Sequence, residues 1–224
     1  MTSFLFVRAP VYTQCQIYED APRPTAGEGK VLIRVHATSV NPFDAAVRAG
    51  YMAAYFNPPL PVILGTDVSG VVEDLGAGVT QFARGDSVYT RAGLSRDGAY
   101  ADYAVVPAAD VAAKPTALDH IHSAAIPHVI LTAWQALIVG ANLSEGQTVP
   151  IHGAAGGVGH IAVQLAKLRG ARVLGTASVN IEFLCQLGVD EVIDYATTPF
   201  EQVGHDVDTN LMLQSAFRGH FHSH

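Results

Sequence analysis

Residues 147–178, QTVPIHGAAGGVGHIAVQLAKLRGARVLGTAS, contain the most regular pattern of the chain. An apolar segment leads into a glycine-rich turn, which is followed by apolar residues at helical spacing and a second apolar segment. The pattern predicts a strand at Val149–His152, a helix from about Val158 to Leu168 and a strand at Arg172–Thr176. We expect one face of that helix to be buried, namely Ile161, Leu165 and Leu168.

The glycines of this turn predict a binding site for a diphosphate. Gly153, Gly156 and Gly159 permit a tight turn, a close approach of ligand to backbone and a close contact of helix with strand. A helix N-terminus also offers backbone N–H groups to a negative charge. We therefore expect the pyrophosphate of a dinucleotide to be bound by Gly153, Gly156, Gly157, Val158 and Gly159.

The end of the second predicted strand indicates which dinucleotide is bound. An acidic residue at this position holds the adenosine ribose of NAD(H) and repels the extra phosphate of NADP(H). The chain instead continues with the segment GTASVN at residues 175–180, and its next acidic residue is Glu182. Hydroxyl and amide groups accept a 2′-phosphate without charge repulsion, so this segment favours NADP(H).

Four segments upstream of the turn carry a family resemblance. They are SVNPFDAAVRAG at residues 39–50, GTDVSGVVEDLGAGVTQFARGDSVYT at 65–90, DGAYADYAVVPAADVAAKP at 97–115 and AAIPHVILTAWQAL at 124–137. In this order, the segments resemble the zinc-independent quinone oxidoreductase branch of the medium-chain dehydrogenase/reductase superfamily. The resemblance extends from the N-terminus to about Asp208.

The resemblance implies an α/β plus β fold, in which a GroES-like, partly open β-barrel precedes an incomplete Rossmann domain, a doubly wound parallel sheet. We assign residues 1–124 to the barrel domain, 125–213 to the N-terminal half of the NADP-binding domain and 214–224 to an atypical tail. Short apolar segments between turn residues agree with a barrel. They include Val31–Val35, Val68–Glu73 and Tyr103–Val106.

The activity implied by the resemblance is hydride transfer from NADPH to a quinone or an activated enone. By the family match, Asn41 lies near nicotinamide and substrate, Asp44 frames that pocket and Tyr51 lines the substrate entrance. Asn41 is equally well explained as a polar turn residue before Pro42, because Asn-Pro is itself a turn signal.

The same match assigns residues to the cofactor. Thr132 contacts the carboxamide end of the nicotinamide. Ser178, Asn180 and Tyr195, beside Thr176 of the hydroxyl-rich segment, surround the adenosine phosphate, and relatives often carry Lys at the position of Asn180. We identify no obligatory general acid, so solvent is expected to protonate the product.

The metal-ligand positions of zinc-dependent relatives are not met. Asn41-Pro42-Phe43-Asp44 stands where the first zinc-binding Cys is expected, and Thr66-Asp67 stands where zinc enzymes carry His-Glu. Without softer ligands the site is not expected to hold zinc. The tail histidines, His220, His222 and His224, remain open to two interpretations: a transition-metal chelate or a loose chain end.

Composition narrows the remaining functional classes. The formal net charge of −7 argues against nucleic acid, and no apolar run is long enough to cross a bilayer. No signal peptide is visible, and the two cysteines, Cys15 and Cys185, show no metal-ligand spacing, which favours a cytoplasmic location. No GxSxG motif supports a hydrolase, and Ser69 is expected to be structural.

Three departures from the family pattern leave the activity in question. The sequence after Asp208 does not continue as in relatives, so part of the six-stranded sheet is expected to be absent, and an oligomer would need a non-standard interface. Pro150 falls in a strand expected to be interior, where it would weaken the ladder. Bulky residues at His128-Val129-Ile130 would fill space near the nicotinamide.

Two hypotheses follow from these observations. The first is an NADP(H)-dependent quinone or enone reductase that acts on a small-molecule substrate. The second is a catalytically impaired, truncated relative that serves as a non-enzymatic or partner-binding fold remnant. NADPH binding distinguishes them.

Overall fold

The computed structural model describes residues 3–6, 16–19, 21–53, 55, 62–93, 98–200 and 207. The chain forms two compact units, Met1–His128 and Val129–His224, whereas the sequence placed the domain boundary after residue 124. The strand expected near Asp208–Leu213 and the tail at 214–224 lie outside the described residues.

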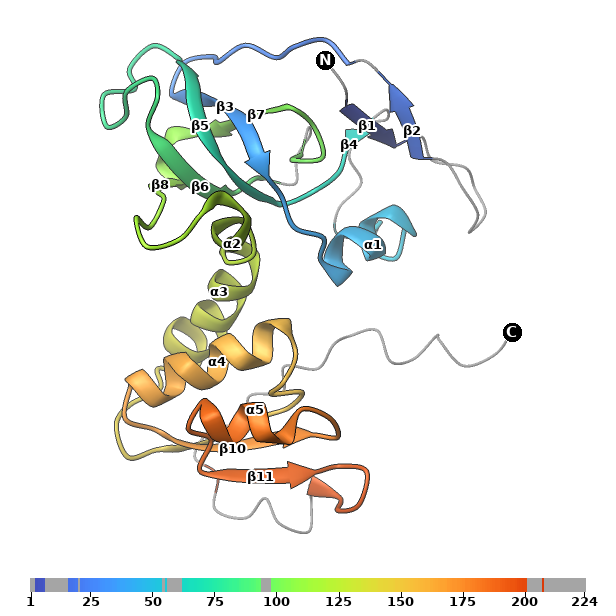
Figure 1. Cartoon of the computed structure of the whole chain (residues 1–224), viewed down its shortest axis with the longest axis vertical. Helices are drawn as coiled ribbons and strands as arrows, with labels where there is room; N and C mark the ends of the chain where they lie inside the picture. Colours follow the sequence, from blue (N-terminus) through green and yellow to red (C-terminus); the bar gives the residue numbers. More distant parts are fainter. Residues whose placement is uncertain are drawn as a thin grey trace. The chain divides into compact units, whose positions relative to one another are not determined.

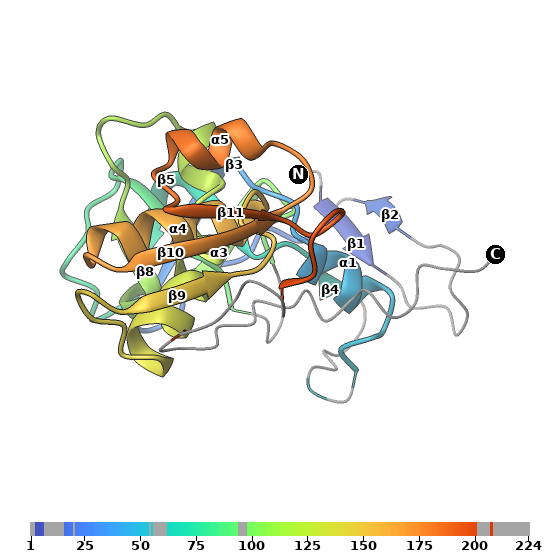
Figure 2. The same ribbon diagram turned by 90° about the horizontal axis from the view of Figure 1, so that it is seen from below.

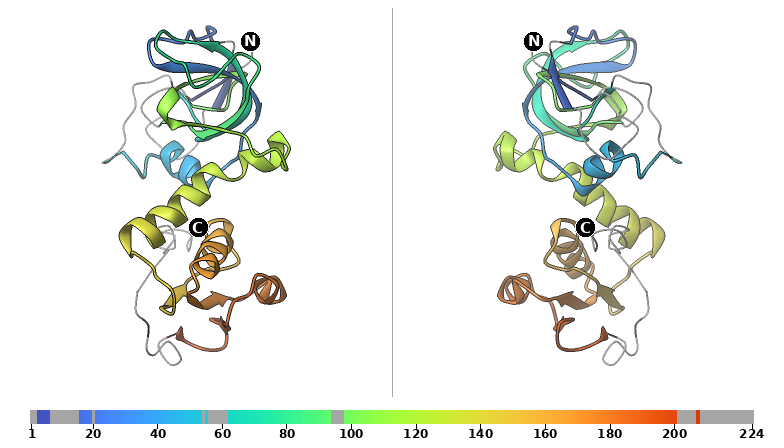
Figure 3. Two further views of the ribbon diagram at one scale, coloured as in Figure 1. Left: turned by 90° about the vertical axis from the view of Figure 1, so that its left-hand side faces the viewer. Right: turned by 90° about the vertical axis from the view of Figure 1, so that its right-hand side faces the viewer.

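The first unit is built on a five-stranded antiparallel sheet in the order β7-β3-β5-β6-β8. The sheet curls around its own core as a half-barrel (Figure 1, Figure 3), which confirms the predicted partly open barrel. Its strands are β3 (Lys30–Ala37), β5 (Asp67–Leu75), β6 (Ser87–Arg91), β7 (Tyr103–Pro107) and β8 (Val111–Ala113). Register shifts in β3 opposite β5, after Leu32 and after Val35, supply bends that help a sheet to curl.

Alternation of side chains along these strands produces the core of the first unit. Val31, Ile33, Val68, Val72 and Val88 are all nearly or completely buried. Since successive side chains on a strand point to opposite faces, one face of β3, β5 and β6 supplies this apolar cluster. The core of the first unit is therefore supplied by the strands that were expected from short apolar segments between turn residues.

The first unit also contains shorter elements. A second sheet has the order β2-β1-β4, and the remaining segments are helical. Their bounds are β1 (Ser3–Phe6), β2 (Gln16–Glu19), β4 (Val62–Ile63), α1 (Pro42–Arg48), α2 (His120–Ala124) and the 3₁₀ turn η1 (Ala108–Asp110).

The second unit contains a three-stranded parallel sheet in the order β11-β10-β9, the described part of a Rossmann domain. Figure 2 shows the three strands side by side with β10 in the middle. The strands are β9 (Thr148–Ile151), β10 (Arg172–Ala177) and β11 (Glu191–Asp194), and the helical segments are α3 (Pro127–Trp134), the π-helix η2 (Gln135–Gly140), α4 (Gly157–Leu168) and α5 (Ile181–Gln186). The strand, turn and helix predicted from residues 147–178 are confirmed.

The buried face of α4 differs from the predicted one. Ala162, Val163 and Ala166 are completely buried, whereas Leu168 is 83% exposed, so its expected burial is wrong. The helix lies against β9 and β10 through small side chains, which allow a close approach, and Ile161 and Leu165 pack at the flank of this contact. Helical periodicity alone therefore predicted the wrong set of buried residues on α4.

Pro150 does not interrupt the ladder between β9 and β10. The Arg172 N–H donates to the Gln147 carbonyl at 2.8 Å, so the backbone groups of Gln147 face β10. Groups alternate along a strand, and those of Pro150 therefore point away from β10. Pro150 therefore does not weaken the pairing of β9 with β10, and its effect on the other side of β9 remains a prediction.

None of the helices within the described residues is sufficiently long and apolar to cross a membrane.

Candidate functional site

The glycine turn joins β9 to the first residue of a 12-residue helix, α4. Gly153 has a φ of +62°, a left-handed conformation that favours glycine. Gly156 is the N-cap residue and has no side chain that caps the first turn. The backbone N–H groups at the start of α4 are thus presented in the way that suits an anion.

The three predicted glycines meet different steric demands. A Cβ on Gly159 would lie 2.2 Å from the Gly153 carbonyl oxygen and 2.7 Å from the Ala154 Cα, so only glycine fits there. A Cβ on Gly156 would meet only the Gly153 oxygen, at 3.1 Å, and one on Gly153 would meet nothing within 4 Å. Gly159 therefore closes the turn onto the helix, while the backbone near Gly153 and Gly156 leaves space for a ligand.

Val129 borders the same turn. A Cβ on Gly157 would lie 3.8 Å from Val129 Cγ1, and Val158 beside it is half-buried. The neighbouring helix α3 also carries Thr132, which is half-buried. The predicted effect of Val129 and Ile130 on the nicotinamide remains a prediction.

Thr176 lies beneath the turn rather than on its surface. Its side chain is 2% exposed, and its hydroxyl accepts a hydrogen bond from the Gly153 N–H at 3.2 Å. The same oxygen lies 3.3 Å from Nδ1 of His152, whose ring meets Phe200 edge-on at 4.7 Å. Strand β10 therefore helps to hold the first glycine of the turn in place.

The residues predicted at the adenosine phosphate gather at the ends of β10 and β11. Ser178 donates a hydrogen bond to the Tyr195 hydroxyl at 2.7 Å, and the Tyr195 side chain is 42% exposed. Asn180 is exposed and adopts a left-handed conformation with φ 57° at the start of α5. The structure thus brings two of these residues into contact and places the third at the start of the next helix.

In the first unit, Asn41 and Asp44 are buried at the N-terminus of α1, and Asn41 is 7% exposed. The Asp44 carboxylate accepts a hydrogen bond from the Asn41 backbone N–H at 2.8 Å, as in a capping box. It also accepts one from the Tyr100 hydroxyl at 3.1 Å. Burial and the neighbouring Asp44 carboxylate raise the pKa of Tyr100, so this hydroxyl stays a hydrogen-bond donor at neutral pH.

Asp67, the first residue of β5, connects this group to other elements. Its carboxylate is completely buried and accepts hydrogen bonds from the Asn41 amide at 2.8 Å and from the Ser39 hydroxyl. Its other oxygen accepts the His128 backbone N–H at 2.7 Å. Three segments of the first unit therefore meet at one buried carboxylate.

The His128 side chain lies beside the same group. Arg91 Nε donates to His128 Nδ1 at 3.3 Å, and the Thr66 hydroxyl lies 3.4 Å from that nitrogen. Burial lowers the pKa of His128, and the Arg91 charge adds to this effect. The ring is therefore neutral at pH 7, with Nδ1 as an acceptor.

Tyr51 follows α1 on an exposed turn, where its side chain is 42% exposed. Its backbone N–H donates to the Ala46 carbonyl at 3.0 Å, so the turn continues from the helix. The structure places Tyr51 just beyond the C-terminal end of α1, on a surface that solvent reaches.

Ser69 is buried, and its hydroxyl lies 2.8 Å from His120 Nδ1. A nucleophile with no solvent access cannot meet a substrate, so this Ser-His contact is structural, as expected. His122 instead pairs with Asp119 at 2.7 Å. The tail histidines His220, His222 and His224 lie outside the described residues.

Zinc does not suit the donors at the predicted ligand positions. Asn41, Thr66 and Asp67 offer an amide, a hydroxyl and a carboxylate, and the Asp67 oxygens already accept three hydrogen bonds. Zinc sites in proteins use Cys, His and carboxylate ligands in a tetrahedral set. Across the described ranges, no three His, Cys, Asp or Glu side chains form a group that could hold a metal ion.

Sequence reasoning missed Ser39 and Tyr100, and it named Asp67 and His128 without the hydrogen bonds that they make here. One signal was present: Asp67 directly precedes the largely apolar stretch Val68–Val72 of β5, where an acid is costly unless its oxygens are hydrogen-bonded. Its partners were not visible, because Asn41 is 26 residues away along the chain.

Two family models match the chain. The model described as "Alcohol dehydrogenase GroES-like domain" covers residues 27–116, and that described as "Zinc-binding dehydrogenase" covers residues 157–211. The two matches fall on the first and the second unit respectively.

Curated relatives cover a large share of this chain. The mitochondrial NAD(P)H oxidoreductase RTN4IP1 of Mus musculus is 40% identical over 190 residues, which are 77% of this chain and 48% of the relative. Quinone oxidoreductase of Homo sapiens is 37% identical over 182 residues, 80% of this chain and 54% of the relative. The chain thus spans about half the length of these proteins.

Among solved structures, an alcohol dehydrogenase superfamily protein from Novosphingobium aromaticivorans superposes with a TM-score of 0.83 at 36% identity. The match covers 90% of this chain and 61% of that structure.

Proposed function

Since the chain belongs to the medium-chain dehydrogenase/reductase superfamily, we propose that it is an NADP(H)-dependent, zinc-independent oxidoreductase of the quinone oxidoreductase type. Its substrate is a small quinone or an activated enone. The observation that carries the proposal is the glycine turn. Gly159 lies against the backbone of Gly153 and Ala154, and the N-terminus of α4 remains accessible to a ligand.

On the cofactor side, bound NADPH supplies a hydride, and the second unit binds and orients the dinucleotide. The backbone N–H groups of Gly157, Val158 and Gly159 bind the pyrophosphate. Ser178, Asn180 and Tyr195 receive the adenosine phosphate. Thr132 holds the carboxamide.

On the substrate side, Asn41 and Asp44 form a buried polar surface at the start of α1, and Tyr51 lines the approach from solvent. A quinone gains negative charge as it accepts a hydride, and an oriented N–H donor such as the Asn41 amide stabilises such charge, whereas the Asp44 carboxylate holds the start of α1 and the Tyr100 hydroxyl in place. Solvent supplies the proton.

The remaining expectations stand as proposals. We place the protein in the cytoplasm, although the mouse relative is named as mitochondrial. It acts on small molecules rather than on nucleic acid or membranes, and a homo-oligomer would form through an interface of its own.

Titration with NADPH tests the proposal, and Trp134, the single tryptophan, reports on it by fluorescence. Saturable binding with a Kd near 1 μM corresponds to about −8 kcal/mol and supports a reductase. Loss of NADPH absorbance on adding 1,4-benzoquinone or an enone then tests turnover. No response at millimolar NADPH supports the alternative, a non-catalytic relative that binds partners.

Gly156→Val is expected to abolish NADPH binding, because the new side chain occupies the space of the pyrophosphate. The fold is expected to persist, since a Cβ at Gly156 meets only the Gly153 oxygen at 3.1 Å. Gly27→Ala is the matched control, because a Cβ there meets nothing within 4 Å. If the Gly156 variant binds NADPH as tightly as the parent, the turn is not the phosphate site.

A further inference from the structure

Asp67 is a charged group held entirely inside the first unit. Its side chain is 0% exposed, and burial of an ionised carboxylate is costly unless its oxygens are hydrogen-bonded. Oδ1 accepts the His128 backbone N–H at 2.7 Å, while Oδ2 accepts the Asn41 amide at 2.8 Å and the Ser39 hydroxyl. Because donors engage both oxygens, the plane of the carboxylate is fixed.

The same contacts fix the Asn41 side chain. Its amide nitrogen donates to Asp67 Oδ2 at 2.8 Å and to the Ser39 hydroxyl at 3.2 Å. Its backbone N–H is held separately by Asp44 at 2.8 Å. A free asparagine amide can rotate to exchange its oxygen and nitrogen, but here the nitrogen must face the carboxylate.

We infer that Asp67 is a positioning residue, whose buried carboxylate sets the direction of the Asn41 amide and hence the polar groups that Asn41 offers to its ligand. The role of Asn41 at the ligand rests on the proposed function. Since Asp67 is completely buried, it acts through Asn41 and not by contact with substrate.

Two single variants test this arrangement by turnover. In Asp67→Asn, one of the two carboxylate oxygens is replaced by an NH₂ group. The donors that lay against that oxygen then face another donor. We expect kcat/KM for 1,4-benzoquinone to fall about 10- to 100-fold, because small misplacements at a reacting centre cost that much. Thr38→Val is the matched control: Thr38 donates to the Asp67 backbone carbonyl at 2.7 Å, outside the carboxylate contacts, and kcat/KM should change by less than about threefold.

The exchanged pair Asn41→Asp/Asp67→Asn separates positioning from stability. The new amide at position 67 donates to the new carboxylate at position 41, so the melting temperature should return towards that of the parent. Turnover should stay low, since position 41 now carries a charge in place of an amide. Recovery of both properties, or full turnover by Asp67→Asn alone, overturns the inference.

A measurement without turnover keeps the inference separate from the proposed function. The side-chain amide protons of Asn41, identified in ¹⁵N spectra by their loss in Asn41→Asp, should exchange slowly with solvent in the parent. They should exchange rapidly in Asp67→Asn, as exposed amides do. Unchanged slow exchange overturns the role of Asp67. If exchange responds as expected but the parent turns over no quinone, the proposed function fails and the positioning of Asn41 stands.

Discussion

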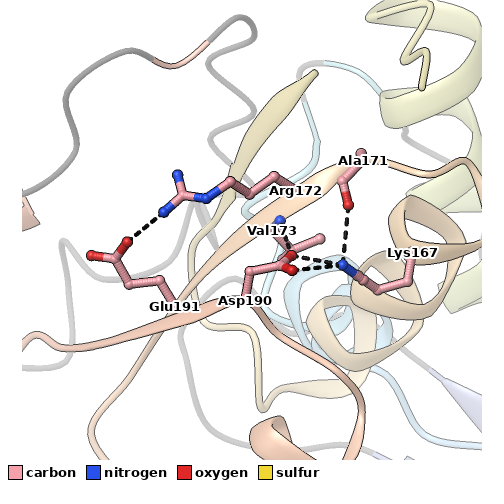
Figure 4. Close-up of polar contacts among 6 residues, drawn as sticks. All are labelled: Lys167, Ala171, Arg172, Val173, Asp190 and Glu191. Carbon is pink, nitrogen blue, oxygen red and sulfur yellow. Dashed lines mark hydrogen bonds and ion pairs between the residues drawn. The ribbon is translucent and has the colours of Figure 1, made fainter. Parts of the chain in front are cut away.

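Asp190 uses one carboxylate to join α4, β10 and the segment before β11 (Figure 4). Lys167 Nζ lies 2.9 and 2.7 Å from its two oxygens, and the Val173 N–H donates to Oδ2 at 2.7 Å. Burial pushes the pKa of Asp190 upwards, but the hydrogen bonds from Lys167 and Val173 outweigh it and leave the pKa below its ordinary value. The ionised form is therefore preferred in the folded protein.

Asp190→Asn is expected to lower the free energy of unfolding by about 1 kcal/mol at pH 7, a modest value because solvent screens this partly exposed pair. A pKa depressed by folding gives stability that is present above the unfolded pKa of about 3.9 and is lost as the pH falls through the folded pKa. Urea unfolding between pH 7 and pH 3 should thus show the difference from the parent shrinking in acid. Glu191→Gln, which alters the neighbouring pair with Arg172, is the control. A difference that grows in acid contradicts the assignment.

At the scale of single residues, the sequence predicted which residues lie at the site better than it predicted their hydrogen-bond partners. Ser178 and Tyr195 were expected at one site and share a hydrogen bond. Thr176 was expected beside a ligand, yet its hydroxyl contacts the turn from within the protein. Local patterns show which residues end a strand, but the inward or outward direction of each side chain depends on how the strands pair.

The close approach of α4 to the turn depends on Gly159. A Cβ there meets the Gly153 oxygen at 2.2 Å, a distance that real side chains do not adopt. Gly159→Ala is expected to cost about 1–3 kcal/mol of the free energy of unfolding, the usual range for overpacking. Gly157→Ala is the matched variant, because its Cβ would lie 3.8 Å from Val129 and alanine favours a helix. Chemical denaturation compares them, and equal stability of the two variants contradicts the close contact.

The elements were the most predictable level of the structure. Strands β9 and β10 and helix α4 were located from apolar periodicity and glycine spacing, because these local signals coincide there. The effect of Pro150 on the pairing with β10 was misjudged, since proline disrupts a ladder only where its missing N–H would face a partner. That direction depends on the register with β10, which a single segment does not reveal.

At the scale of the whole molecule, each unit has an apolar core of its own. Val31, Val68 and Val88 belong to one cluster, whereas Val149 and Val163 belong to the other. Units with separate cores can differ in local stability. A ligand that binds one of them stabilises that unit by an amount that grows with the logarithm of the ligand concentration divided by Kd.

The predicted dinucleotide contacts lie mainly in the second unit, so NADPH is expected to protect that unit most strongly from hydrogen exchange. At a concentration of 100 times Kd, binding adds about 2.7 kcal/mol to the free energy of opening, which slows exchange about 100-fold where opening releases the ligand. Exchange measured by mass spectrometry should slow in peptides covering β9, the glycine turn, α4 and β10. Peptides from β5 and β6 serve as the internal reference. Protection confined to β5 and β6 would place the dinucleotide elsewhere, and Gly156→Val should remove protection from the glycine-turn peptides if the turn holds the pyrophosphate.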